Sequence, residues 1–583
     1  MPARAHAPDR LTRRLAAGAS AAALLALLGA PAAQAADPAP AQTNSPAGAS
    51  TGSSTGTSAA TSTGASTGTP TGSPTGAPAD APGVHGASAQ DALIARGKYL
   101  ATAADCGPCH TGPGMQPYSG GLYMSTPFGK ISTPNITPDK ATGIGNWTDA
   151  EFYDVLHNGI GRSGEYLYPV MPFPWYTKVT HDDALAIRAY LASLKPVHAP
   201  RKPNELEFPF NIRTGLLAWR TAFFHEGTFK PDPSKSEQIN RGAYLVTALG
   251  HCSECHGEAI FGASMMAKPF EGGSIDHWYA PNITSDPKEG IGSWTQDQLA
   301  TYFKTGTAEG KSVALGPMHE VVHDSLSQLT DGDRLAIAAY LKSTAPEEKY
   351  SADKLQAFAG RSGPGANVYL NHCSSCHQQD GKGVPNEVPP LAGNGAVVAQ
   401  GPQNVIRVVL AGIPAQGDYR QMPALGADMT DQQIADVANY VRNSWSNASP
   451  RPAQAGEVGE LRAHAFIQLA GPHPSCVEPG SHPKQDSLAQ TIADPKSGIQ
   501  PLLAAVTPDN MINKVGELID KLHSVAPHAA KADTVNDLTT AYCPVIAADT
   551  KLDENNRRWQ LQRFAQVVYS ELTTPEKVVR SAK

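Results

Sequence analysis

Apolar side chains recur at helical spacing in six stretches of the chain, and these stretches form three matching pairs. The opening stretches occupy residues 91–100, 241–245 and 365–370, and the closing stretches occupy 184–191, 335–341 and 434–441. Apolar positions three and four residues apart lie on one face of an α-helix. The pattern therefore predicts three repeated segments, each bounded by an opening and a closing helix.

The two helices of each segment have residues suited to a close crossing. Each opening helix has a glycine before an aromatic residue, as in Arg241-Gly242-Ala243-Tyr244-Leu245, and each closing helix has a tyrosine. Glycine lets two helices approach closely because it has no Cβ, and a tyrosine would pack at the crossing. We therefore expect the two helices of a segment to cross at the glycine.

Between its two helices, each segment contains the pattern Cys-x-x-Cys-His. The residues are Cys106, Cys109 and His110; Cys252, Cys255 and His256; and Cys373, Cys376 and His377. Two cysteines at this spacing form thioethers with the vinyl groups of a haem, and the adjacent histidine is then the proximal ligand of the iron. A zinc site would need two such pairs to converge, and a thioredoxin-like redox pair has no need of the histidine. The repeats therefore predict three covalently bound haem c groups.

A methionine follows each motif at a comparable place. Met171, Met318 and Met422 lie 61, 62 and 45 residues beyond the histidine of their segment, in Pro-containing stretches that we expect to be loops. A single methionine is more often core filler, but three at matching places indicate sixth ligands, because a thioether raises the potential of a haem. The competing candidates are His319 and His323 in the second segment and Met429 in the third. With every iron position filled, the haems are expected to carry electrons and no catalytic residue is predicted.

The first two segments also share a duplicated loop. Pro134-Asn135-Ile136-Thr137 and Pro281-Asn282-Ile283-Thr284 lie at the same distance, within one residue, from their histidines. Thr148 and Thr295 follow in matching positions, as N-caps of the next helix. For Asn135 and Asn282 two roles remain open, a hydrogen bond to a haem propionate or the holding of the loop.

The N-terminal part of the chain has the features of an export signal. Four arginines precede an apolar run from Leu15 to Ala30, and Ala33-Gln34-Ala35 has the small residues of a cleavage site. Residues 36–88 are almost entirely Ser, Thr, Gly, Ala and Pro, a composition that cannot build a core. The export signal therefore predicts a periplasmic protein. No later run is long enough to span a membrane, so any association with the inner membrane is expected to be peripheral.

Charge and the remaining cysteines narrow the picture further. The formal net charge is −7 at pH 7, and the predicted signal carries four arginines against one aspartate, so the rest of the chain is more acidic still. Nucleic acid is therefore not an expected partner. Cys476 and Cys543 lie outside the motifs, and in an oxidising compartment a disulfide is the default for such a pair. A metal site at His473, Cys476 and His482 is the weaker alternative.

A chain of 583 residues is too long for one ordinary domain. We predict a mainly α fold of three tandem class I-like cytochrome c domains plus a small α-helical C-terminal domain. The predicted parts are a signal peptide at 1–35, a low-complexity disordered linker at 36–88, cytochrome c domains at 89–200, 236–347 and 358–450, a connector at 201–235, and a helical C-terminal domain of unknown role at 456–583. In the last of these, Thr507 and Pro508 predict a helix start, and Leu561 and Phe564 mark a further helix.

Residues 89–450 resemble the three-haem cytochrome c subunits of bacterial periplasmic, membrane-associated dehydrogenases for alcohols, gluconate, sorbitol and aldehydes. Besides the haem motifs, the resemblance rests on Tyr168-Pro169-Val170-Met171-Pro172, on Gly316-Pro317-Met318 and above all on the connector from Asn204 to Arg213 with Trp219. It implies a separate catalytic subunit with a flavin or quinone cofactor, and electron delivery to ubiquinone or a terminal oxidase. The residues after 450 depart from the family, whose members usually end there.

Two other functions stay open at this point. One is a free-standing electron shuttle to an oxidase, which a neighbouring oxidase gene would favour. The other is a self-contained haem enzyme such as a peroxidase, which needs one haem to lose its methionine and would show high-spin iron. The substrate of a partner dehydrogenase is not encoded in this chain.

Overall fold

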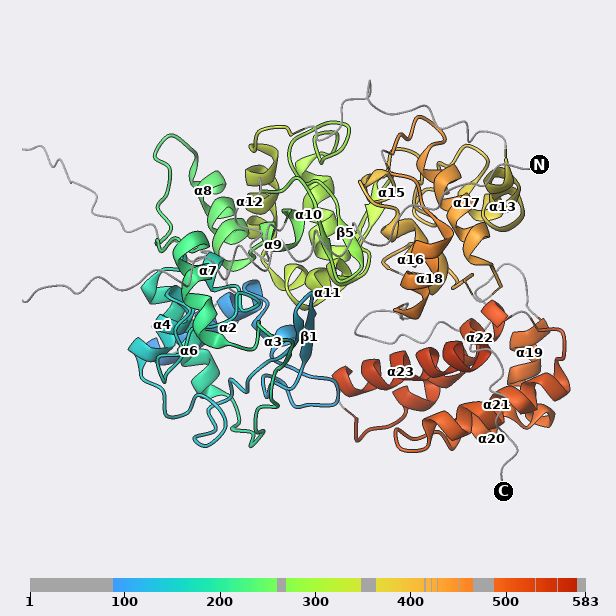
Figure 1. The fold of residues 1–583 in the computed structure, drawn as a ribbon, viewed down its shortest axis with the longest axis horizontal. Coiled ribbons are helices and arrows are strands. Elements are labelled where there is room, and N and C mark those ends of the chain that lie inside the picture. Colours follow the sequence, from blue (N-terminus) through green and yellow to red (C-terminus); the bar gives the residue numbers. More distant parts are fainter. Residues whose placement is uncertain are drawn as a thin grey trace, which may run out of the picture. The chain divides into compact units, whose positions relative to one another are not determined.

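The computed structural model describes residues 88–258, 269–347, 363–413, 416–420, 422–426, 428–449, 451–464, 487–529, 531–552 and 554–573. Helices dominate this part of the chain, and the strands are short and antiparallel (Figure 1). The mainly α prediction is therefore confirmed. The predicted signal peptide and all of the predicted linker except Ser88 lie outside the described residues.

The first segment and its connector begin with a helix capped by Ser88, whose hydroxyl accepts from the backbone N–H of Asp91. The elements in order are α2 (Ala89–Ala103), α3 (Cys106–Cys109), β1 (Tyr123–Thr126), β2 (Gly129–Ser132), α4 (Asp149–His157), α5 (Phe173–Tyr176), α6 (His181–Ser193), β3 (Glu205–Leu206), the 3-10 turn η1 (Arg213–Gly215) and α7 (Leu216–Phe223). The connector strand β3 pairs with β2, with Lys130 opposite Glu205. The connector is thereby tied to the segment it leaves.

The second segment repeats this order. It comprises α8 (Glu237–Tyr244), the π-turn η2 (Leu245–Leu249), α9 (Ser253–His256), β4 (Gly273–Ile275), β5 (Trp278–Ala280), α10 (Gln296–Thr305), β6 (Thr307–Ala308), β7 (Ser312–Val313), α11 (Pro317–Asp324), η4 (Leu326–Gln328) and α12 (Asp331–Lys342). The sequence repeat is therefore also a repeat of structure.

The third segment is shorter. It comprises α13 (Pro364–His372), α14 (Ser374–His377), α15 (Gly395–Val398), α16 (Gln403–Ala411) and α17 (Asp431–Arg442). The next helix, α18 (Ala455–Ala463), buries Val458 and Leu461 in the same cluster as Val441 of α17. Helix α18, which lies at the predicted boundary at residue 456, therefore packs with the third segment.

The helix crossings within the segments follow the sequence prediction. A Cβ at Gly97 would lie 1.8 Å from the Ala186 carbonyl oxygen, and one at Gly242 would lie 1.9 Å from that of Ala336. No side chain fits such a space, so only glycine allows α2 to cross α6, and α8 to cross α12. Tyr190 and Tyr340 pack beside these glycines, since the same added Cβ atoms would lie 3.0 and 2.7 Å from the tyrosine Cβ atoms. Both features of the predicted crossing are confirmed.

The first two segments share one hydrophobic core. Leu100 and Ile187 of the first segment belong to the same buried cluster as Leu245 and Ile337 of the second. Burial of apolar surface is the main favourable contribution to folding, so the two segments are expected to fold as a unit. The sequence repeat marks 89–200 and 236–347 as separate domains, whereas their packing joins them.

Reciprocal hydrogen bonds also tie these two segments together. Tyr99 of α2 donates to Oδ2 of Asp333 on α12 over 2.6 Å, and Tyr244 of α8 donates to Oδ2 of Asp183 on α6 over 2.6 Å. Each segment thus gives one tyrosine and one aspartate to the other. This exchange is what a twofold relation between duplicated segments produces.

Each of these aspartates is also paired with an arginine of its own segment. Arg96 Nη2 lies 2.6 Å from Asp183 Oδ1, and Arg241 Nη2 lies 2.7 Å from Asp333 Oδ2. Burial raises the pKa of Asp333, but the hydrogen bonds and charge of Arg241 and the hydrogen bond of Tyr99 outweigh it, so the net shift is downward. The aspartate is therefore held as a carboxylate at neutral pH.

The C-terminal helices form a cluster of their own. They are α19 (Ser487–Ala493), the turn η6 (Pro495–Ser497), α20 (Ile499–Ala504), α21 (Met511–Val525), α22 (Lys531–Ala547) and α23 (Glu554–Thr573), whose apolar faces meet in one buried cluster (Figure 1). The predicted helix start at Thr507-Pro508 is corrected, since α21 begins at Met511 and Thr507 N–H donates to Asn510 Oδ1 in the preceding turn. The three residues of the alternative metal site, His473, Cys476 and His482, lie outside the described residues.

Candidate haem sites

Each Cys-x-x-Cys-His motif forms a single helical turn with the histidine at or just beyond its end. The turns are α3, α9 and α14, and the six cysteines are free thiols. Burial raises the pKa of Cys106, Cys252 and Cys255 to about 12, so these thiols stay protonated at neutral pH. A redox-active thiol needs a lowered pKa, whereas two free cysteines at this spacing, followed by a histidine, fit thioether attachment of a haem.

The first two proximal histidines are oriented in the same way. Nδ1 of His110 lies 2.8 Å from the Pro134 carbonyl oxygen, and Nδ1 of His256 lies 2.7 Å from that of Pro281. A carbonyl accepts only, so Nδ1 carries the proton and Nε2 is left with its lone pair. Such a hydrogen bond fixes the tautomer and the ring orientation of a metal-ligating histidine. Both histidines therefore fit axial ligation of iron.

His377 is held less firmly. Burial lowers its pKa to about 4, which the nearby Pro389 carbonyl opposes. Among the described residues, however, its buried Nδ1 has no partner in hydrogen-bond geometry. The ring is neutral at pH 7, as a ligand must be, but its orientation is less constrained than that of the other two histidines.

The loop asparagines hold the loops. Asn135 Oδ1 accepts from the N–H of Thr137 over 2.9 Å, and its amide donates to Thr142 Oγ1 and to the Val197 carbonyl. Asn282 repeats this with Thr284 and donates to the Glu347 carbonyl over 2.8 Å. These hydrogen bonds engage both ends of each amide, so the loop-holding role is favoured over binding of a propionate.

The predicted N-caps of the helices that follow are confirmed. Thr148 accepts from the N–H of Glu151, and Thr295 accepts from that of Gln298. In both cases the third helical residue bonds back to the cap, which completes a capping box. The duplicated loop therefore ends in the same local structure in both segments.

The predicted sixth ligands lie in three different local structures. Met171 lies in a bend and is packed against the shared core, as is Cys106. Met422 pairs with Ile413 in a β-bridge and is packed against the same cluster as Cys373. Met318 is half-buried in the first turn of α11, so the expected loop is corrected to a helix start there. Met429 is buried core in the third segment.

Taken together, the residues fit haem c. Each motif offers two thiols at thioether spacing and a histidine that is buried or half-buried, and two of the three methionines pack against the same core as their motif. In the part of the chain described, no three His, Cys, Asp or Glu side chains gather as another metal site would require. Haem bound there would supply one-electron redox chemistry, and the protein would supply axial ligands and a buried setting.

Two residues that were not singled out from the sequence lie directly before the first two motifs. Asp105 and His251 each directly precede a first cysteine, and both have a positive φ, 53° and 34°. Burial raises the pKa of Asp105 to about 7, against the opposing charge of His251. His251 Nδ1 in turn lies 3.2 Å from Glu254 Oε2. The sequence signal that could have identified Asp105 and His251 is their position directly before the first cysteine of a motif.

The short helix α5 also connects the two motifs. Trp175 Nε1 donates to Ser253 Oγ, between the cysteines of the second motif, over 2.8 Å. The Tyr176 hydroxyl donates to the Ala104 carbonyl, two residues before Cys106, over 2.5 Å, and its ring lies 5.6 Å from that of His251. Both aromatic side chains are buried. Haem sites one and two are therefore structurally continuous.

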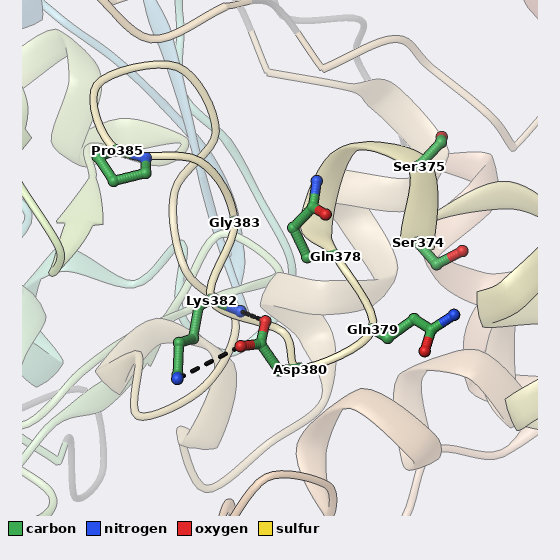
Figure 2. A pocket seen from close by; sticks show the side chains of 8 residues that line it. All are labelled: Ser374, Ser375, Gln378, Gln379, Asp380, Lys382, Gly383 and Pro385. Atoms are coloured by element: carbon green, nitrogen blue, oxygen red, sulfur yellow. Dashed lines mark hydrogen bonds and ion pairs between the residues drawn. The ribbon is translucent and has the colours of Figure 1, made fainter.

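The third motif lies at an open surface. Cys376 is exposed, and a pocket of about 760 Å³ lies beside the motif, lined by Ser374, Ser375, Gln378, Gln379, Asp380, Lys382, Gly383 and Pro385 (Figure 2). Lys382 pairs with Asp380 across 3.3 Å at one side of it, as Figure 2 shows. Six of the eight lining residues are polar or charged, so the pocket offers hydrogen-bonding groups at the surface beside the third motif.

Across the described residues, no helix has the length and apolar character of a membrane span.

Comparison with known proteins agrees with the geometry. The family model of cytochrome c matches residues 94–195 and 362–445, the first and third segments. The chain is 38% identical over 398 residues to the cytochrome c subunit of the quinone-type alcohol dehydrogenase of Gluconacetobacter polyoxogenes, a match that covers 64% of this chain and 85% of that protein.

Two further relatives are electron-transfer subunits of other dehydrogenases. The fructose dehydrogenase cytochrome subunit of Gluconobacter japonicus is 40% identical over 414 residues, covering 65% of this chain and 84% of that protein. The gluconate 2-dehydrogenase cytochrome c subunit of Pantoea cypripedii is 36% identical over 405 residues, covering 65% of this chain and 92% of that protein. The relatives differ in substrate and share the cytochrome role.

Proposed function

Because this chain belongs to the family of cytochrome c subunits of dehydrogenase complexes, we propose that it holds three haem c groups in a relay from a catalytic subunit to ubiquinone or a terminal oxidase. The chain is an electron-transfer subunit, and substrate oxidation belongs to its partner. The catalytic haem enzyme considered from the sequence is therefore set aside.

The observation that carries the proposal is the threefold Cys-x-x-Cys-His turn. His110 and His377 are buried, each 8% exposed, and His256 is half-buried. Each such turn supplies the attachment and one axial ligand of a haem c. We infer three haems because all three segments have the complete set of residues.

Methionine at the sixth position completes the proposal. Met171, Met318 and Met422 would each raise the potential of their haem relative to histidine ligation, into a range suited to accepting electrons from a reduced organic cofactor. Hydrogen bonding and burial then set the three potentials apart. His110 and His256 have a carbonyl partner for Nδ1 and His377 has none in hydrogen-bond geometry among the described residues, so we propose that the third haem differs most from the other two.

The predicted export signal supports a periplasmic location for the relay. A catalytic subunit with a flavin or quinone cofactor would meet it there, and possible peripheral attachment would bring it to the quinone pool of the inner membrane. The C-terminal helices have no assigned role. We propose that they dock to the partner subunit or to the membrane surface.

Replacement of one methionine in the third segment tests the ligation. Met422→Leu is expected to remove the methionine-to-iron charge-transfer band of one haem and to lower its potential, with haem content unchanged. Met429→Leu is the matched control, because Met429 is core filler of nearly the same volume as leucine. Equal spectra for both variants would contradict Met422 as a ligand.

Reduction by a partner tests the function itself. We expect the isolated chain to remain oxidised with alcohols, gluconate or sugars as substrates, and to become reduced when its dehydrogenase subunit is added. Substrate oxidation by the isolated chain would overturn the assignment. The gene next to the one for this chain identifies the subunit to add.

A further inference from the structure

A buried contact joins the loop of the first predicted sixth ligand to the second haem attachment turn. Trp175 lies four residues after Met171, and its indole N–H donates to Ser253 Oγ over 2.8 Å. Ser253 directly follows Cys252, one of the two cysteines that would attach the second haem. The indole is 5% exposed, so the contact is shielded from water.

The backbone between Met171 and Trp175 is itself compact. The Phe173 N–H donates to the Met171 carbonyl over 2.7 Å, and the Trp175 N–H donates to the Pro172 carbonyl over 3.0 Å. Tyr176, the next residue, donates to the Ala104 carbonyl beside the first motif and contacts His251 beside the second. One short turn therefore contacts a side chain within the second motif and residues beside both motifs.

Electron tunnelling decays less steeply along covalent and hydrogen bonds than across empty space. From these contacts we infer that Trp175, through its hydrogen bond to Ser253, is the positioning residue that couples the first haem site to the second. The inference rests on the proposed function, because it requires haem at both turns. With haem at both turns, a single electron would pass from the ferrous iron of one haem to the ferric iron of the other, with no bond broken and no proton moved.

The serine at the corresponding position of the third motif makes its hydrogen bond within its own segment. Ser374 occupies the same motif position as Ser253, directly after the first cysteine, yet its hydroxyl donates to the Leu370 carbonyl of the preceding helix α13 over 2.9 Å. The same residue type at the same place thus serves its own helix in one motif and a neighbouring segment in the other. Ser374 is therefore a matched control.

The test measures electron equilibration among the haems of the full-length protein after one-electron reduction by a radiolysis pulse. Ser253→Ala removes the acceptor, and Trp175→Phe removes the donor but keeps an aromatic ring. We expect several-fold slower equilibration in both variants, with unchanged reduction potentials. Ser253→Thr, which keeps a hydroxyl, is expected to retain the rate, and Ser374→Ala is expected to equal the unaltered protein.

Three outcomes decide between the possibilities. An unchanged rate in Ser253→Ala overturns the inference, whether or not Trp175→Phe folds. A slower rate that is accompanied by shifted potentials also overturns it, because the side chains would then act on the haems themselves. A protein with fewer than three haems by mass, measured first, would contradict the proposed function and not the coupling alone.

Discussion

The hydroxyl of Tyr99 donates a 2.6 Å hydrogen bond to the carboxylate of Asp333, a residue 234 positions away in the sequence. The same hydroxyl accepts from the backbone N–H of Thr330 over 3.1 Å, at the start of the helix that carries Asp333. One side chain of the first segment thereby caps and contacts a helix of the second. With its counterpart from Tyr244 to Asp183, it aligns the two segments that share a core.

Loss of the Tyr99 hydroxyl tests this alignment. Tyr99→Phe is expected to lower the free energy of unfolding by about 2 kcal/mol, the usual net contribution of a hydrogen bond to a charged group. Tyr123→Phe is the control, since its hydroxyl makes an exposed bond to the Pro203 carbonyl. Chemical denaturation of both variants measures the difference, and equal stabilities would contradict a specific contribution from Tyr99.

The pairing of Asp333 predicts a pH dependence. Its pKa lies below the ordinary value of 3.8, because the contacts of Arg241 and Tyr99 outweigh burial. A carboxyl whose pKa is lower in the folded state contributes stability above its unfolded pKa, and this stability is lost as the pH falls through the folded pKa. We therefore expect the free energy of unfolding to fall below pH 3.8, the ordinary value.

Asp333→Asn isolates this contribution. The variant is expected to be less stable at neutral pH by about 2 kcal/mol, because Arg241 loses a charged hydrogen-bond partner. It should also lose part of the acid dependence. Asp182→Asn, at an exposed carboxylate on α6, should keep the acid profile of the unaltered protein. Parallel profiles for all three proteins would contradict the assigned role of Asp333.

The crossing at Gly97 predicts a steric penalty. Gly97→Ala places a Cβ against the Ala186 carbonyl, where the available distance is 1.8 Å, so α2 and α6 must separate. We expect a loss of about 2 kcal/mol, as for other overpacked cores. Gly332→Ala is the matched control, because its nearest neighbour is Thr330 Oγ1 at 3.9 Å. Thermal unfolding should rank Gly97→Ala well below it.

The remaining cysteine pair gives a prediction for the C-terminal helices. Cys543 is buried in their apolar cluster, and its predicted partner Cys476 lies outside the described residues. The two cysteines are 67 positions apart. Closure of a loop of this length is expected to stabilise the C-terminal helices by about 4 kcal/mol on the chain-entropy model. Peptide mapping without a reductant should recover the two cysteines in one linked peptide. Recovery of both as free thiols would contradict the pairing.

Local features of the fold followed directly from the sequence. The caps Thr148 and Thr295 depend on residues close in sequence, whose geometry is set by one hydrogen bond. Short-range patterns of this kind specify their own structure. The helix crossings join residues far apart in sequence, and they could be predicted because a glycine and a tyrosine recur in every repeated segment.

Contacts between distant residues that no repeated pattern marks could not be predicted from the sequence. Nothing in the sequence pairs Tyr99 with Asp333 or Trp175 with Ser253, because such contacts depend on how two duplicated segments pack. Met318 was expected in a loop, and it starts α11 because Pro317 occupies the first helical position, where its missing N–H costs nothing. The role of Asn135 also depended on distant residues, because two of its three partners, Thr142 and Val197, are reached only in the folded structure.

The central claim, three haems attached by three motifs, is tested most directly by the intact mass of the secreted protein. We expect the mass of the mature polypeptide plus three haems, and the loss of one haem when Cys252→Ala and Cys255→Ala are combined. Fewer than three haems in the unaltered protein, or an unchanged number in the double variant, would contradict it.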